Sequence, residues 1–474
     1  MKKILLSLAL LAPFFCIGQE AAVLSKLDSK SDFYGDIAMQ LWSNPELGYL
    51  ETKSSALLQK TLSDAGFKVT AGVAEIPTAF VAEYGSGKPV VGIMAEFDAL
   101  PGVSQKAVPY REPVVEGGAG HACGHHLFGS ASVAAGISVA EWMKENNIKG
   151  TVRVYGTPAE EGGGGKVYMA KSGVMDDVDA MLHWHAGSSN NAGANSSLAN
   201  ISTKFRFYGE AAHAAAAPDR GRSALDGVEA MNFMVNLMRE HVPMETRMHY
   251  VITSGGEAPN VVPAYAESYH YVRHPDALKV KEIFAQMVKI AEAAALGTKT
   301  EMEYEIINGV YNILPNETIS RIMHKNLEIV GGVEYTAEER KFAEEIISTF
   351  PEGVLASPED AAKIEPFEVR EKGTGGSTDV GDVSWIVPTA GLRTATWVPE
   401  TSAHTWQAVA AGGTTIGKKG MMVAAKTLTL TAMDIFNDPS VTAAAKAELD
   451  RRRGSGFKYE ALTGERKPPL DYRK

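Results

Sequence analysis

The chain has 474 residues, of which 45% are hydrophobic and 22% charged, a composition typical of a globular protein with two or more domains. Its formal net charge is −11 and it has no concentrated stripe of Lys and Arg, which argues against a nucleic-acid partner. No segment approaches the length and apolarity of a transmembrane helix.

Residues 1–18 have the pattern of an export signal. A pair of lysines precedes the apolar run 4–15, which is too short to span a bilayer. Cleavage before Gln19 would give an exported chain, periplasmic or secreted. Lipidation of Cys16 is the alternative, although two phenylalanines stand before it where such processing prefers small residues.

Three apolar, strand-like runs end in acidic or histidine side chains. They are 90–95 before Glu96 and Asp98, 151–157 before Glu160 and Glu161, and 180–184 before His185. In open α/β sheets, functional sites are built at the carboxyl ends of the strands. The sequence therefore predicts a site at this edge of a sheet.

The stretch HACGHH, residues 121–126, places three histidines and a cysteine before a run of small residues that suits a helix. Without the export signal, Cys123 is the only cysteine and has no partner for a disulfide. A thiolate and imidazoles within one turn suit a borderline divalent ion. A buried, inert thiol is the alternative.

Residues 201–308 show the element order β-α-β-β-α-β of a ferredoxin-like unit. The strands are expected at 201–208, 248–253, 265–273 and 299–306, and the helices at 223–239 and 278–296. Such a unit can be an independent domain inserted into a larger one. We therefore predict an α/β fold in which a doubly wound domain is interrupted by this insertion.

The doubly wound domain resumes after the insertion. Helices are expected at 319–330, 337–350 and 416–436, with a strand at 391–398. The predicted division is a signal at 1–18, the first part of the catalytic domain at 19–200, the inserted domain at 201–308, the second part at 309–450, and a charged, poorly packed tail at 451–474.

Eight ordered motifs resemble the co-catalytic metallopeptidases that include aminoacylases and glutamate carboxypeptidases, and within them the amidohydrolase branch. The motifs are DALPG, HACGHH, GTPAEEGGGGK, LHWHAG, GEAAHAAAAPDRGRSALDGVEAMN, GGEAPNVVP, GGSTDVGDVSW and AHTWQ. They cover nearly the whole chain after the signal. The resemblance implies a zinc-peptidase-like catalytic domain with an inserted lid and dimerisation domain.

The resemblance also implies a centre of two divalent metal ions, either Mn²⁺ or Zn²⁺. The positions that match the family's ligands are Cys123, His125, Glu161, His185 and His404. Cys123 would be a thiolate, shared between the two ions, and Glu160 matches the general base. The thiolate favours zinc, whereas the branch often implies manganese.

Further residues match positions around the family's site. His213 matches a lid histidine that reaches the neighbouring active site of a dimer and stabilises the oxyanion, and Asn260 and Arg273 match lid positions that bind the substrate's carboxylate end. A surface ion pair is the alternative for Arg273. Asp98 and Asp379 are expected to orient the ligands.

Two departures from the branch pattern bear on the metal stoichiometry. His126 stands where many members have Asp, and Thr378-Asp379 stands where many have a Glu-Asp pair. His121 and His183 are expected to pack around the site rather than bind metal.

The expected reaction is hydrolysis of the amide bond of N-acyl amino acids with an aromatic acyl group, p-aminobenzoyl-glutamate first, by metal-activated water with Glu160 as base. An export signal would suit scavenging of folate breakdown products. The alternatives are an exported metallo-dipeptidase or carboxypeptidase, and a catalytically silent binding protein of the same fold. A homodimer through the lid is the expected assembly, and the need for a second, distinct subunit stays open.

Overall fold

The computed structural model describes residues 12–373 and 375–473. Of the predicted export signal, residues 1–11 lie outside this range, and the remainder belongs to helix α1 (Ala12–Ser29). No helix within the described ranges is both long and apolar enough to cross a membrane.

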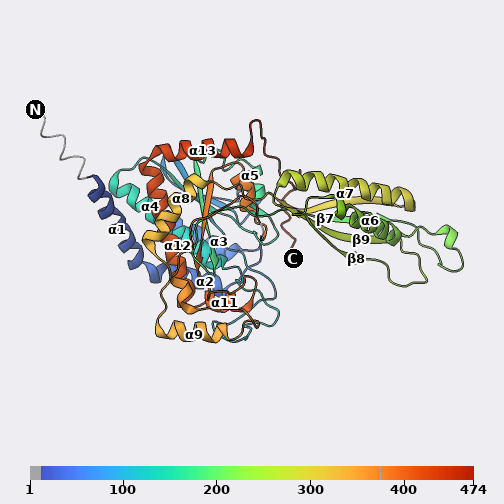
Figure 1. The fold of residues 1–474 in the computed structure, drawn as a ribbon, viewed down its shortest axis with the longest axis horizontal. Helices are drawn as coiled ribbons and strands as arrows, with labels where there is room; N and C mark the ends of the chain where they lie inside the picture. Colours follow the sequence, from blue (N-terminus) through green and yellow to red (C-terminus); the bar gives the residue numbers. More distant parts are fainter. Residues whose placement is uncertain (1–11, 374, 474) are drawn as a thin grey trace, which may run out of the picture.

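A six-stranded sheet forms the centre of the larger part of the molecule (Figure 1). In the order β1-β2-β4-β3-β5-β12, its strands are Lys68–Ala71, Phe80–Ser86, Gly150–Gly156, Val90–Ala95, Ala180–Gly187 and Thr389–Ala395. Strands β4, β3, β5 and β12 run parallel to one another, whereas β2 pairs antiparallel with β4 and β1 pairs antiparallel with β2. The carboxyl ends of four strands therefore lie along one edge of the sheet.

Helices cover both faces of this sheet, which confirms the predicted doubly wound class. α4 (His125–Asn146) and α12 (Thr415–Asn437) pack over one face in the larger apolar core. α5 (Gly165–Lys171) and α10 (Val380–Ser384) pack over the other face in a smaller core. The other α-helices of this part are α2 (Ser31–Ser43), α3 (Thr52–Asp64), α8 (Glu317–Val330), α9 (Ala337–Ile347), α11 (Trp406–Gly412) and α13 (Pro439–Arg453). A short parallel ladder joins β6 (Ala194–Asn195) and β11 (Val369–Arg370).

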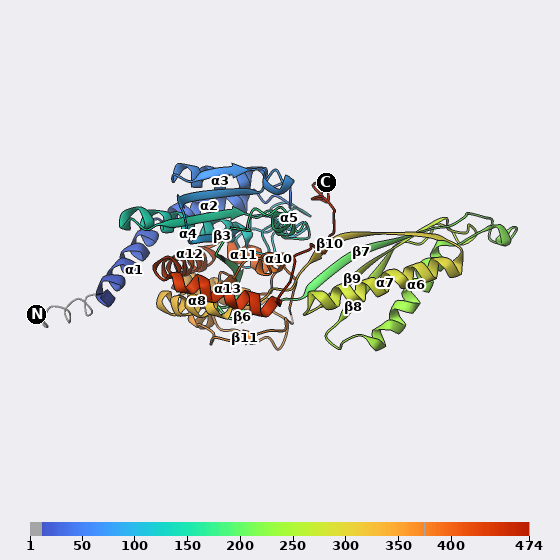
Figure 2. The same cartoon turned by 90° about the horizontal axis from the view of Figure 1, so that it is seen from above.

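The inserted unit, here called the lid domain, comprises residues 199–310 and extends to one side of the molecule in both views (Figure 1, Figure 2). Its elements, in chain order, are β7 (Ala199–Tyr208), α6 (Ala224–Met238), β8 (Arg247–Ser254), β9 (Tyr265–His274), α7 (Ala277–Thr298) and β10 (Glu301–Val310). The strands form one antiparallel sheet in the order β10-β7-β9-β8. The element order is the predicted one, and the strand order is likewise that of a ferredoxin-like unit.

Buried apolar and half-exposed charged residues alternate along the lid strands, which explains why both helices lie on one face of the sheet. Phe205 and Phe207 of β7 are buried, while Lys204 and Arg206 between and beside them point to the other face. The buried residues form an apolar core of their own with α6 and α7. The lid domain thus has a core distinct from the cores around the larger sheet.

The predicted poorly packed tail is wrong for residues 454–473, here called the strap. Tyr459 donates a hydrogen bond to Asp382 Oδ1 at 2.7 Å, and Leu462 is buried against the lid core. Further on, Leu470 and Tyr472 pack against the smaller core of the catalytic domain. Apolar and aromatic side chains scattered among the charges thus anchor the strap where the two domains meet (Figure 2).

Candidate metal centre

Five segments bring their polar side chains together at the carboxyl edge of the larger sheet. Glu96 and Asp98 follow β3, Glu160 and Glu161 follow β4, His185 lies near the end of β5, Cys123 and His125 stand at the start of α4, and His404 lies between β12 and α11. Parallel strands end at the same edge, so residues distant in sequence become neighbours. The strand-end pattern in the sequence correctly predicted this convergence.

The potential ligand atoms form three overlapping groups, and within each group all of these atoms lie within 4.8 Å of one another. The groups are Cys123 with His125 and His185, Cys123 with Glu161 and His404, and His125 with Glu160 and Glu161. All five expected ligands and the expected base are therefore brought together. Cys123 belongs to two groups, which is the position that a thiolate shared between two ions requires.

Local backbone geometry allows this close approach. Gly124, between Cys123 and His125, has φ of 76°, and a Cβ there would come within 2.3 Å of the Ala186 side chain. His404 has φ of 64°, which is uncommon for a residue with a side chain. Such conformations cost energy and are retained mainly at functional sites.

Asp98 contacts two of the expected ligands. Its Oδ1 accepts from His125 Nδ1 at 2.9 Å, and its Oδ2 accepts from the backbone N–H of Glu161 at 3.0 Å. This contact leaves His125 Nε2 facing the cluster. His185 is oriented similarly, because its Nδ1 lies 2.7 Å from the carbonyl oxygen of Ala186.

Asp379 contacts a buried lysine instead of an expected ligand. Lys166 Nζ lies 2.7 Å from Asp379 Oδ1 and 2.7 Å from Glu96 Oε1, and the lysine is fully buried. Glu96 Oε2 in turn lies 3.0 Å from His125 Nε2. Asp379 is thus connected to His125 through Lys166 and Glu96 and does not itself contact an expected ligand. The sequence has no signal for Lys166, since a lysine after four glycines resembles an exposed loop.

Burial changes the protonation of the groups in the cluster. It raises the pKa of Glu160 well above its ordinary value, and the neighbouring Glu161 raises this pKa further. Burial likewise raises the pKa of the Cys123 thiol. Glu161 Oε1 is buried, and it lies 3.2 Å from Nε2 of His404, another expected ligand. A divalent cation would offset the cost of burying these carboxylates together, so the sulfur, nitrogen and oxygen donors fit a metal centre.

The strap reaches the loop that carries the two glutamates. Tyr472 Oη and Arg473 Nη2 both donate hydrogen bonds to the carbonyl oxygen of Glu161, at 3.1 and 2.9 Å. The Tyr472 ring packs edge-on against Tyr49, whose hydroxyl donates to the carbonyl of Gly163 in the same loop. The strap therefore holds the backbone next to an expected ligand, which no sequence pattern predicted.

The three lid residues lie apart from the centre of their own chain. His213 and Asn260 are exposed and close together, because the N–H of Ala214 donates to the Asn260 carbonyl at 3.0 Å. Arg273 lies on the open face of the lid sheet, with its guanidinium 5.3 Å from the centre of the Tyr271 ring. None of the three lines the cavity beside the metal centre.

The two histidines beside the expected ligands make structural contacts. His121 Nε2 lies 3.2 Å from the Leu41 carbonyl oxygen, and His126 Nε2 lies 3.0 Å from that of Gly412. Both rings are buried and belong to none of the three ligand groups. His126 thus links α4 to the end of α11.

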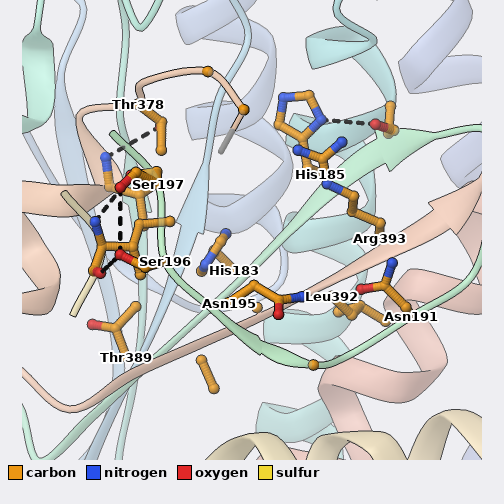
Figure 3. Close-up of a pocket in the computed structure, with 18 of the residues that line it drawn as sticks. His183, His185, Asn191, Asn195, Ser196, Ser197, Thr378, Thr389, Leu392 and Arg393 are labelled. Atoms are coloured by element: carbon orange, nitrogen blue, oxygen red, sulfur yellow. Dashed lines mark hydrogen bonds between the residues drawn. The ribbon is translucent and has the colours of Figure 1, made fainter. Parts of the chain in front are cut away.

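A cavity of about 480 Å³ opens beside the ligand groups (Figure 3). One wall carries Glu160, Glu161, His185 and His404, and the remainder comes mainly from residues 191–197, 375–378 and 389–393. His183, which was expected to pack around the site, lines the cavity, and so does Arg393, which no sequence pattern singled out. The cavity is large enough to hold a small organic substrate against the metal centre.

Comparison with known proteins gives consistent matches over most of the chain. Residues 92–429 match the model of peptidase family M20/M25/M40. One subunit of the p-aminobenzoyl-glutamate hydrolase of Escherichia coli is 41% identical over 429 residues, covering 85% of this chain and 89% of that protein. The Xaa-Arg dipeptidase of Mus musculus is 28% identical over 438 residues, covering 90% of each chain. The crystal structure of a dinuclear metal-binding M20 peptidase of Bacillus subtilis has a similar fold, with a TM-score of 0.58, 16% identity, and coverage of 88% of this chain and 99% of that one.

Proposed function

Because this chain belongs to peptidase family M20/M25/M40, we propose that its metal centre hydrolyses the amide bond of N-acyl amino acids with an aromatic acyl group, p-aminobenzoyl-glutamate first. Family membership makes the chain a hydrolase of amide bonds and confirms the resemblance found in its motifs. The observation that carries the proposal is the convergence of five ligand-type residues and Glu160 beside one cavity.

We propose two divalent ions, with the Cys123 thiolate shared between them. His125 and His185 would complete one coordination group, and Glu161 and His404 the other. Bound there, the ions would polarise the amide carbonyl and lower the pKa of a water molecule towards neutrality. The candidates for the metal are zinc, which thiolate ligation favours, and manganese, which the branch resemblance favours.

The chain's own residues would carry the proton transfers. Glu160 lies beside the ligand Glu161, with its carboxylate close to those of the potential ligands, and we assign it the role of taking a proton from the attacking water. It would then deliver this proton to the leaving amine.

We expect the strap to affect metal affinity. In the double variant Tyr472→Phe/Arg473→Ala, the Glu161 carbonyl loses both donors while the ring packing on Tyr49 is kept. The affinity for Mn²⁺ or Zn²⁺, measured by equilibrium dialysis, should fall about 10-fold, as for other groups that orient a ligand. Lys467→Ala is the matched control, since it removes only an exposed ion pair between the strap and Glu75. Equal affinity in both variants would mean that Asp98 alone holds Glu161.

We propose that the working unit is a homodimer formed through the lid domain. Among the described residues, the edge strand β8 pairs only with β9, and its Val251 and Ile252 are 58% and 45% exposed. Phe233 and Leu237 of α6 are 64% and 54% exposed. Exposed apolar groups beside an unpaired strand edge suit a symmetric partner.

In such a dimer, His213 would act in the partner's active site. We expect His213→Ala and Glu160→Ala each to be inactive alone. When the two are co-expressed with different tags and the mixed dimer is isolated, one complete site forms per dimer, giving roughly half of the wild-type turnover. An inactive mixed dimer, with size-exclusion confirming the assembly, would show that His213 does not act across the interface.

We further propose that the chain is exported. The charged start and short apolar run of residues 1–18 support this proposal. The E. coli relative is named as one subunit of its hydrolase. Activity assays of the purified chain therefore also test whether it needs a second, distinct subunit.

Two other functions are tested together with this one. The mouse relative is named a dipeptidase, which favours cleavage of small peptides as the first alternative. The second, a binding protein without catalytic activity, is disfavoured because all five ligand-type residues and Glu160 are present. A panel of p-aminobenzoyl-glutamate, hippurate and dipeptides ending in Arg or Glu, assayed with the metal-loaded protein, separates them. Preferred release of p-aminobenzoate supports the proposal. Preferred dipeptide cleavage, or none at all in protein that binds metal, overturns it.

A further inference from the structure

Arg393 is a positively charged side chain in a cavity otherwise walled by carboxylates, imidazoles and neutral groups. We propose that Arg393 binds the side-chain carboxylate of the substrate's leaving amino acid, so that the site selects acidic residues over neutral and basic ones. This inference rests on the proposed function and assigns its specificity to one residue of the catalytic domain.

The position of Arg393 follows from the register of the sheet. Arg393 of β12 pairs with His185 of β5, and Gly391 pairs with His183. Paired residues on adjacent parallel strands project to the same face, about 4.8 Å apart. Arg393 therefore lies one strand away from an expected metal ligand and on the cavity side of the sheet, as Figure 3 shows.

Its guanidinium is available for a ligand. Within the described part of the chain, Arg393 donates no side-chain hydrogen bond and has no carboxylate within 4.0 Å, although its backbone pairs with Asn191. It is also the only Lys or Arg among the described residues that line the cavity. A guanidinium beside His185, where a metal cation is expected, is electrostatically unfavourable until an anion is bound nearby.

The surroundings of Arg393 also suit a carboxylate. Asn195 also lines the cavity, and its side-chain amide N–H groups are donors of the kind that a carboxylate accepts. His183 lies over Gly391, where a Cβ would come within 2.2 Å of its Nε2. The His183 ring also lines the cavity and can donate one N–H there.

This charge arrangement separates the candidate substrates. A planar guanidinium forms two parallel hydrogen bonds with a carboxylate, which is a strong and directional contact. The same charge repels the guanidinium of a dipeptide that ends in arginine. Arg393 therefore favours an acyl-glutamate over the type of substrate named for the mouse relative.

The test compares kcat/KM for p-aminobenzoyl-glutamate and p-aminobenzoyl-glutamine in the metal-loaded wild-type protein and in Arg393→Met. The two substrates differ in one charge, so their ratio isolates side-chain recognition. We expect the variant to lose about 100-fold for the glutamate substrate, mainly in KM, and less than about 3-fold for the glutamine substrate. Arg393→Lys should restore part of the ratio, and Arg340→Met, which removes a surface arginine paired with Glu359, should leave it unchanged.

An unchanged glutamate-to-glutamine ratio in Arg393→Met that binds metal and folds as the wild type does would overturn the inference and leave the proposed function intact. An equal loss of kcat/KM for both substrates would overturn the inference as well, since it would show that Arg393 maintains the structure of the site and does not recognise the side-chain carboxylate. If the wild-type protein cleaves dipeptides and not p-aminobenzoyl-glutamate, the proposed function fails. The same ratio, measured with alanyl-glutamate and alanyl-glutamine, then decides the role of Arg393 by itself.

Discussion

Replacing Glu160 by glutamine should lower turnover on the order of 1,000-fold and leave the metal content unchanged. The amide keeps the size of the side chain but cannot accept a proton from water or return it to the leaving amine. Glu160 belongs to one of the three ligand groups, together with His125 and Glu161, so its assignment as base instead of ligand needs this direct test. Turnover of p-aminobenzoyl-glutamate and metal content by elemental analysis are the two measurements.

The matched control is Glu344→Gln, which neutralises an exposed carboxylate on α9. It should leave both quantities unaltered. If Glu160→Gln instead loses one ion per chain, Glu160 is a ligand and the base must be sought elsewhere. Full turnover in the variant would remove Glu160 from the mechanism.

Replacing Cys123 by alanine should remove both metal ions and with them all measurable turnover, a loss of more than about 1,000-fold. The thiol belongs to two of the three ligand groups, so a single substitution weakens both coordination sites. His404→Ala is the informative comparison, because His404 belongs to one group only.

We expect His404→Ala to retain one ion per chain, held by Cys123, His125 and His185, when metal content is measured after dialysis. Two ions retained in Cys123→Ala would contradict the shared thiolate and would make Cys123 the buried, inert thiol that the sequence left as an alternative. Equal losses in both variants would show that neither ion binds without the other.

The metal centre could be predicted from the sequence because its chemistry is encoded locally. Glu160, Glu161 and His185 lie at or just after the ends of apolar strands, and the parallel order of β3, β4, β5 and β12 brings those ends together, whereas His404 was expected from the motif resemblance alone. The close approach at Gly124, by contrast, became apparent only from its φ of 76° in the structure. The β-α-β-β-α-β order of the lid was clear in the alternation of its strands.

Other features depend on contacts between distant segments and left no local pattern. Lys166 follows a glycine run, and its burial arises only because Glu96 and Asp379 approach it from two other elements. The strap is rich in charge, and its anchoring residues, such as Leu462 and Tyr472, have no regular spacing that would indicate a helix or strand. Arg393 was not singled out, because a single arginine in a strand does not reveal which face it occupies.

The claim that the chain is a metal-dependent amidohydrolase is tested most directly by a metal titration. Protein without residues 1–18 is stripped of metal and then titrated with Mn²⁺ and, separately, with Zn²⁺. Release of p-aminobenzoate from p-aminobenzoyl-glutamate is followed at each step, together with the bound metal. We predict no turnover without metal and a rise to a plateau at two bound ions per chain, as expected for a centre that shares Cys123. Turnover in the metal-free protein, or none on this substrate with both ions bound, would contradict a two-metal amidohydrolase.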